Sequence, residues 1–122
     1  MSMDGLVEWV AEALEDAAGT ISARKMFGGL ALYSQGRIFA MIADDMLWFK
    51  ADAESDADWD AAGCPHFTYD FGDGKMAGSM NYRRAPDDVY DDAEAMRHWA
   101  GVALAAAARA PAKKPKARKK PA

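Results

Sequence analysis

The side chains best suited to chemistry are gathered around Cys64. The segment Cys64-Pro65-His66 places a thiol near an imidazole, and His98 is the only other histidine among 122 residues. A cysteine and a histidine can act as nucleophile and base, but two residues apart on an extended segment they lack a third group to orient them. A zinc site ordinarily uses four ligands, and the chain holds three Cys or His residues in all. We therefore expect a structural thiol, and no catalytic residue, metal or cofactor.

An acidic run, Asp56-Ala57-Asp58-Trp59-Asp60, has the spacing of carboxylates in a calcium loop. A calcium loop needs glycine at its sixth position and a bidentate glutamate at its twelfth. Those positions are Ala61 and Phe67 in this chain. We expect instead a short solvated helix over 53–62, capped by Asp52 and ended by Gly63.

The glycine pair Gly28-Gly29 follows two cations, Arg24 and Lys25, and invites comparison with a phosphate-binding loop. Neither the G-x-x-x-x-G-K-[ST] nor the G-x-G-x-x-G pattern occurs. We interpret the pair as a bend or bulge between apolar segments, because glycine tolerates close backbone approach. Arg24, Lys25 and Arg37 could form a small basic patch, but we expect them to be solvent-facing partners of carboxylates.

Charge is distributed very unevenly along the chain. All nineteen acidic residues and nine of the fifteen basic residues precede Pro111, which gives that part a net charge of −10. The remaining six cations form a tail of Ala, Pro, Lys and Arg that is expected to be disordered when free. The tail cations are Lys113, Lys114, Lys116, Arg118, Lys119 and Lys120. Such an arm can bind DNA or RNA through phosphates without reading sequence; the alternatives are that it folds back on the acidic body or only aids solubility.

Hydrophobic periodicity predicts the elements that must position these residues. We expect helices at 4–18 (capped by Asp4 and ended by Gly19), 53–62 and 91–109, the last opened by a capping-box-like pair, Asp91 and Glu94. We expect strands at 21–33 (one bent strand or two short ones), 37–43, 46–50, 67–71 and 75–82. The order α-β-β-β-α-β-β-α predicts a two-layer α+β domain over residues 1–109 with a mostly antiparallel five-stranded sheet, and the basic tail at 110–122.

The central strands are apolar on both faces. In the strand at 37–43, Ile38, Ala40 and Ile42 are expected to face one way and Phe39 and Met41 the other. A half-exposed strand would alternate apolar and polar residues. We therefore expect both faces to be covered, by helices or by a second subunit in a homodimer.

The segment Arg24-Lys25-Met26-Phe27-Gly28-Gly29-Leu30-Ala31-Leu32-Tyr33 resembles the signature of the N-terminal domain of the TfoX/Sxy family. The resemblance continues through Phe39 to Asp44, Leu47 to Lys50, Pro65 to Tyr69 and Met80-Asn81-Tyr82, and covers about residues 10–108. It implies a small α+β domain, a regulator of DNA-uptake competence acting with a cyclic-AMP receptor protein, and no catalytic residues. Arg24, Lys25, Met26, Phe27, Gly28, Gly29 and Tyr33 are then structural motif residues. Named members also carry a C-terminal helical-hairpin domain, where this sequence has its basic tail.

We expect a non-enzymatic, cytoplasmic regulatory module that contacts a protein partner, such as a transcription regulator, and binds nucleic acid through its tail. A single cysteine and the lack of a secretory signal or long apolar run favour the cytoplasm over a membrane or secreted location. The alternative is a small-molecule-binding domain or enzyme that uses a groove near Gly28-Gly29 and Cys64. A structural dimer serving an unseen partner is a third interpretation.

Overall fold

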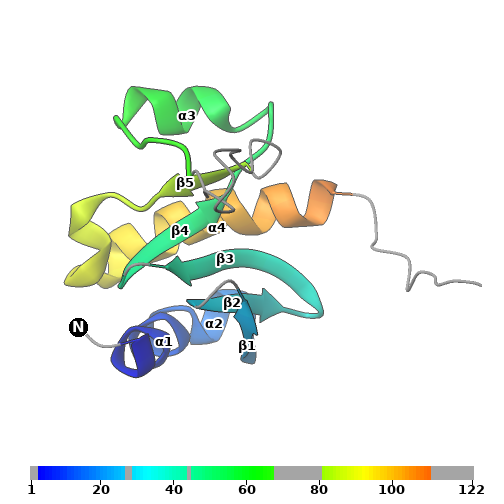
Figure 1. Cartoon of the computed structure of the whole chain (residues 1–122), viewed down its shortest axis with the longest axis vertical. Coiled ribbons are helices and arrows are strands. Elements are labelled where there is room, and N and C mark those ends of the chain that lie inside the picture. Colours follow the sequence, from blue (N-terminus) through cyan, green and yellow to red (C-terminus); the bar gives the residue numbers. More distant parts are fainter. Residues whose placement is uncertain (1–2, 27–28, 44, 68–80, 111–122) are drawn as a thin grey trace, which may run out of the picture.

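The structure is a computed structural model that describes residues 3–26, 29–43, 45–67 and 81–110. Its elements, in chain order, are α1 (Met3–Ala13), α2 (Glu15–Ala18), β1 (Ile21–Met26), β2 (Gly29–Ser34), β3 (Arg37–Ala43), β4 (Met46–Lys50), α3 (Asp56–Ala61), β5 (Tyr82–Arg84), the 3₁₀ helix η1 (Asp87–Tyr90) and α4 (Ala93–Arg109). The predicted α+β class is confirmed, as is the succession of helix, strands, helix, strand and helix (Figure 1).

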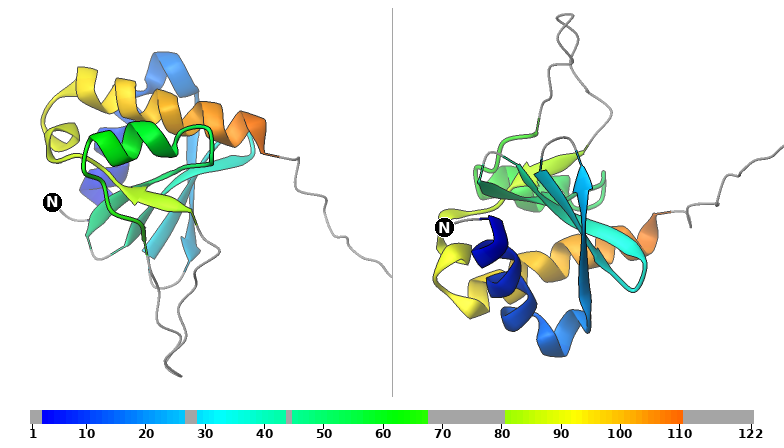
Figure 2. Two further views of the ribbon diagram at one scale, coloured as in Figure 1. Left: turned by 90° about the horizontal axis from the view of Figure 1, so that it is seen from above. Right: turned by 60° about the horizontal axis from the view of Figure 1, so that its bottom comes forward.

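The five strands form one antiparallel sheet in the order β1-β2-β3-β4-β5, so each strand pairs with its neighbour in the chain. The helices lie on one side of this sheet, and α4 runs across it against β3 and β4 (Figure 2, left). We call the side that carries the helices the inner face and the opposite side the outer face. The domain therefore has two layers, one of helices and one of strands.

The glycine pair lies where β1 and β2 meet. Met26 pairs with Gly29, so 21–33 forms two short antiparallel strands, which confirms the second of the two predicted alternatives over one bent strand. Gly28 and Phe27 lie outside the described residues. A Cβ on Gly29 would overlap the carbonyl oxygen of Ile42 on β3. Gly29 therefore allows close approach of two backbones in the sheet.

A register shift in β3 changes which residues share a face. Leu32 pairs with Ala40, but the next residue of β2, Tyr33, pairs with Ile38. Phe39 is thus the extra residue of a β-bulge, and the alternation of side chains slips by one position. Phe39 joins the inner core with Ala40, whereas Ile38 packs in a separate cluster with Met41. The predicted faces of Ile38 and Phe39 are therefore wrong.

Several helix ends differ from the predictions because side chains compete for the terminal N–H groups. The Oδ1 atom of Asp92, not of Asp91, accepts from the backbone N–H groups of residues 94 and 95 at 2.9 and 3.4 Å, so Asp92 is the N-cap of α4. Asp52 accepts from the N–H of Ser55 at 3.0 Å and closes a turn, which delays the start of α3 to Asp56. The helix predicted at 4–18 is interrupted at Leu14, and Gly19 ends it in a left-handed conformation, φ 67°.

The predicted strand at 67–71 lies outside the described residues apart from Phe67, and the strand predicted at 75–82 lies outside them up to residue 80. The neighbouring segment that is described forms β5, which extends two residues beyond the predicted end at Tyr82.

The inner core joins both layers. Trp59 of α3 is fully buried and lies between Phe49 of β4 and Trp99 of α4, with ring centroids 5.8 and 4.7 Å away. Leu6 and Val10 of α1 are buried in the same cluster. Among the described residues no helix is long and apolar enough to cross a membrane.

Candidate nucleic-acid interface

The two layers of the domain carry opposite charges. The five strands contain six basic residues and no acidic residue, whereas the helices and η1 together contain eleven acidic residues and two basic ones. The strand cations are Arg24, Lys25, Arg37, Lys50, Arg83 and Arg84. A protein with a net charge of −4 thus presents a cationic sheet.

Arg83 is the strand cation that joins the two layers. It is 2% exposed, and its guanidinium lies 3.2 Å from Asp56 and 2.8 Å from Asp60, both on α3. Its Nη1 atom also donates to the carbonyl oxygen of Cys64 at 2.7 Å. The acidic run predicted to be a solvated helix therefore uses two of its carboxylates to neutralise a buried arginine. Among the described residues, no group of three His, Cys, Asp or Glu side chains could hold a metal ion.

The tail cations, from Lys113 to Lys120, lie outside the described residues, but the point at which the tail begins is well defined. Arg109, the last residue of α4, donates to both carboxylate oxygens of Asp52 at 2.8 and 2.9 Å. This interaction lowers the pKa of Asp52 to about 2. Arg37 donates to the carbonyl oxygens of Ala107 and Ala110 at 3.2 Å each, which satisfies acceptors at the end of α4. The end of α4, from which the tail starts, therefore lies beside the acidic segment that contains Asp52.

The motif residues are spread over the first hairpin. Arg24 lies over the ring of Tyr33, with the guanidinium carbon 5.6 Å from the ring centroid. Lys25 is exposed and pairs with Leu30, which places it at an inner-face position. The ion pairs in the described part of the chain use Arg83 and Arg109, and none uses Arg24, Lys25 or Arg37. The predicted carboxylate partners of these cations are therefore not found there.

Cys64 and His66 occupy different environments. Cys64 is 5% exposed, and burial raises the pKa of its thiol despite the nearby charges of Arg83 and Arg84. His66 is exposed and forms an isolated antiparallel bridge with Arg83. A thiol with a raised pKa is a weak nucleophile at neutral pH, so the arrangement favours the predicted structural role of Cys64.

The groove considered as an alternative site would need Gly29 and Cys64 to lie together. Gly29 is on β2, whereas Cys64 lies beside β5, three strand spacings or about 14 Å across the sheet. A hollow of about 310 Å³ does lie beside Cys64, and Arg84 and Pro86 line it. A second hollow, of about 400 Å³, lies between α3 and α4 and is lined by residues that include Asp58, His98 and Gly101.

A two-layer α+β domain with an acidic helical layer, a cationic antiparallel sheet and a basic C-terminal tail defines the class of this protein. The chain belongs to the family described as the TfoX N-terminal domain, whose model matches residues 12–107. The resemblance expected from the motif residues is thereby confirmed. The matched region runs from the end of α1 to the last turn of α4, and the tail lies beyond it.

One similar protein is the DNA transformation protein TfoX1 of Aliivibrio fischeri (strain ATCC 700601 / ES114). The two chains are 31% identical over 51 residues, which cover 42% of this chain and 24% of the relative. The chain therefore spans about a quarter of the length of that protein.

Lys50, Arg83 and Arg84 were not predicted from the sequence to belong to a charged layer. Lys50 and Arg84 lie far apart in sequence, and only the strand register places them on one face. The available signal was the scarcity of Asp and Glu in the predicted strands: Asp70 is the one acidic residue within them, and the other eighteen lie elsewhere.

Proposed function

We propose that this protein is a non-enzymatic regulatory module of the TfoX type, which acts on transcription or DNA-uptake competence through a protein partner. In this proposal the basic tail adds sequence-independent contact with nucleic acid. The observation that carries the proposal is membership of the TfoX N-terminal domain family over residues 12–107. The similarity to a DNA transformation protein of Aliivibrio fischeri supports the competence role.

The tail is expected to act mainly through counterion release. If all six tail cations contact phosphates of duplex DNA, log K falls against log[salt] with a slope of about −5, from 0.9 per phosphate. Affinity then drops about a thousandfold between 50 and 200 mM salt. The Asp52–Arg109 contact holds the last residue of α4, just before the tail begins, and uses none of the six tail cations.

The test compares the full chain with a variant of equal length in which the six tail cations are glutamine. Retention on a duplex DNA column at low salt should fall sharply in the variant. Equal retention of the two chains would contradict nucleic-acid contact by the tail. A pull-down of both chains with and without nuclease then tests the protein partner: a transcription regulator that persists after nuclease supports the proposal, and its loss with nuclease contradicts it.

The hollow beside Cys64 favours one second candidate, a small-molecule-binding domain. Its ligand would lie against Arg84 and Asp87, so a metabolite with a charge of each sign is the expected class. A rise in melting temperature with such a metabolite, abolished by Arg84→Gln, would favour this candidate over the regulatory module.

A further inference from the structure

The outer face of the sheet has a row of residues that crosses all five strands. Arg24 stands opposite Ala31, Ala31 opposite Met41, Met41 opposite Trp48 and Trp48 opposite Arg84. A cation therefore stands at each end of a row with an apolar centre. Four strand spacings separate Arg24 from Arg84, which is about 19 Å.

A second row on the same face adds aromatic residues and a third cation. Tyr33 stands opposite Ser22 and Ile38, and Lys50 stands opposite Tyr82. The Nζ atom of Lys50 lies 5.8 Å from the centre of the Tyr82 ring. Burial raises the pKa of Tyr82 to about 12, and the charge of the Tyr33 phenol adds to this rise.

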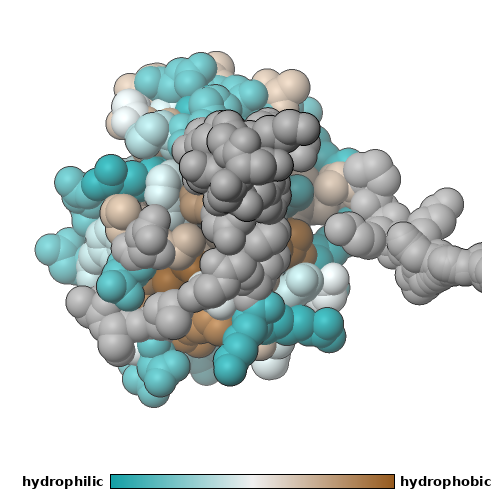
Figure 3. Space-filling view, in the orientation of Figure 1, coloured by the Kyte–Doolittle hydropathy of each residue, from teal (hydrophilic) through white to brown (hydrophobic). Residues whose placement is uncertain are grey.

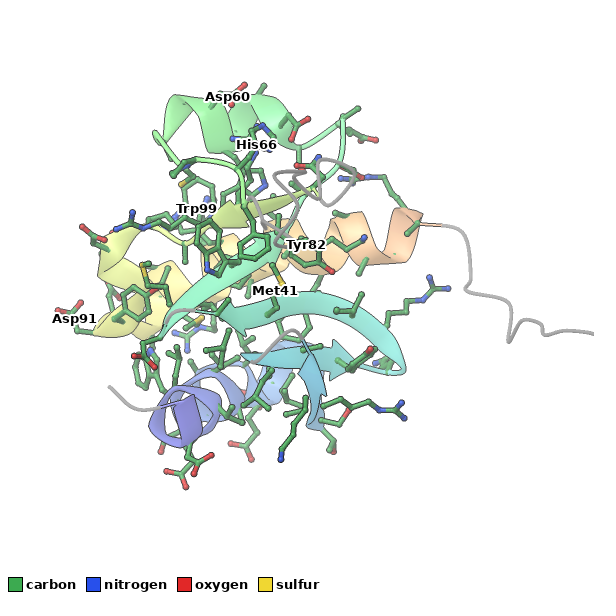
Figure 4. All side chains as sticks on the ribbon, in the orientation of Figure 1. Met41, Asp60, His66, Tyr82, Asp91 and Trp99 are labelled. Atoms are coloured by element: carbon green, nitrogen blue, oxygen red, sulfur yellow. The ribbon has the colours of Figure 1, made fainter. Side chains whose placement is uncertain are left out.

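Met41 and Tyr82, labelled in Figure 4, mark the outer face, which is turned towards the viewer while α4 passes behind the sheet. Figure 3 shows brown, apolar residues on this face with teal, polar residues around its rim. Met41 and Trp48 are 2% and 8% exposed, whereas Tyr33 is half-buried and Arg24 and Arg84 are exposed. The accessible groups of the outer face thus include its cations and Tyr33, together with the exposed Ser22 and the half-buried Ile38, Ala43 and Met46.

Charge decides what kind of partner this face suits. None of the outer-face positions in the five strands carries a carboxylate, and the cations Arg24, Lys50 and Arg84 form no ion pair within the described residues. Cations beside an aromatic ring, with no ion pair among the residues that the structure describes, suit a polyanion that also carries planar groups. Single-stranded nucleic acid has both, because its phosphates are regularly spaced and its bases are free to stack on aromatic side chains. A duplex offers the phosphates but keeps its base faces stacked inside.

We propose that the outer face of the sheet binds single-stranded nucleic acid. Its phosphates are contacted by Arg24, Lys50 and Arg84. The Arg24 guanidinium, which lies over the Tyr33 ring in the free chain, moves to a phosphate, and one base stacks on the ring in its place. The inference rests on the proposed function only in taking nucleic acid as the ligand. It gives the folded domain a nucleic-acid contact of its own, separate from that of the tail.

The test uses fluorescein-labelled oligothymidylate of 15 nucleotides, with a blunt duplex of equal length, and reads fluorescence anisotropy between 25 and 200 mM salt. The tail-neutral chain, with its six cations changed to glutamine, should still bind the oligothymidylate with a log–log slope of about −2, from 0.7 for each of three phosphates. In the full chain, joint replacement of Arg24, Lys50 and Arg84 by glutamine should reduce the magnitude of the slope by about 2.

Two further variants separate stacking from charge. Tyr33→Leu should lower affinity for oligothymidylate by about fivefold or more without changing the salt slope, because a stacked base is lost but no phosphate contact. Tyr33→Phe keeps the ring and should retain the affinity, which also controls for folding. The single variants Arg24→Gln and Lys25→Gln form a matched pair, because the two residues are neighbours on β1 but lie on opposite faces. Lys25→Gln is the control and should leave the slope of log K against log[salt] unchanged.

The outcomes distinguish the two proposals. If the tail-neutral chain does not bind oligothymidylate while the full chain does, the outer-face site is overturned and the tail remains. Another outcome is that the tail-neutral chain binds as the full chain does while the triple outer-face variant fails to bind. That result supports the outer-face site and contradicts nucleic-acid contact by the tail. Equal affinity of the tail-neutral chain for duplex and oligothymidylate overturns base stacking. A triple variant that binds normally but no longer self-associates in sedimentation equilibrium shows that a second copy occupies this face, and overturns the proposal.

Discussion

Replacement of Gly29 by alanine tests whether the glycine of the family motif is required by the sheet itself. The added Cβ would overlap the carbonyl oxygen of Ile42 and lie 3.0 Å from its carbonyl carbon. These are backbone atoms of the adjacent, central strand β3, so no side-chain rotation relieves the overlap, and β2 or β3 must shift. Overpacking of this kind costs about 1–3 kcal/mol of unfolding free energy.

The matched control is Gly101→Ala on α4, where a Cβ meets no atom within 4 Å. Alanine is favoured over glycine inside a helix by about 0.5–1 kcal/mol, so this variant should be stabilised. At roughly 4 °C per kcal/mol, thermal unfolding followed by circular dichroism should show a loss of about 4–12 °C for Gly29→Ala and a gain of about 2–4 °C for Gly101→Ala. A Gly29→Ala melting temperature equal to that of the natural chain would refute the close approach of β2 to β3.

Other predictions concern the helix ends and the buried thiol. Asp92→Ala should cost about 1 kcal/mol in urea unfolding because it removes the N-cap of α4, while Asp91→Ala should change little; equal effects would contradict the cap assignment. The folded-state pKa of Asp52 is depressed to about 2 from 3.8, so its contribution to stability is present above about pH 4 and is lost as the pH falls towards 2. Arg109→Gln should weaken that pH dependence, because the hydrogen bonds with Ser55 that also lower this pKa remain, and an unchanged acid-unfolding profile would count against the ion pair. Cys64 should react with a thiol reagent at pH 8 at least about tenfold more slowly in the folded chain than in urea, since it is buried with a raised pKa; equal rates would reopen a catalytic role.

The sequence predicts β3 and β4 to the residue because sharp turns separate them from their neighbours. Gln35, Gly36 and Asp45 all have positive φ, between 53° and 78°, and Gly36 and Asp45 are of residue types that tolerate this conformation. The same reasoning misplaces the faces of Ile38 and Phe39, because a β-bulge depends on pairing with β2 and leaves no mark in the local periodicity.

The candidate sites were predicted less completely than the fold. The basic tail is predicted from composition alone. The ion pair that joins α3 to β5 cannot be predicted in this way, because Arg83 lies 27 residues from Asp56 and only tertiary packing brings the two together. The cationic outer face also depends on strand register, which aligns residues from 24 to 84 in one row.

The most direct test of nucleic-acid contact by the folded domain is an NMR titration of the ¹⁵N-labelled full chain with oligothymidylate. The account predicts amide shifts grouped at Arg24, Tyr33, Lys50 and Arg84 on four strands of the sheet, together with shifts in residues 111–122, and little change along the acidic helices α1 and α3. Shifts confined to residues 111–122 would contradict the assignment of a nucleic-acid site to the sheet. Absence of any shift at low salt would contradict nucleic-acid binding by this protein altogether.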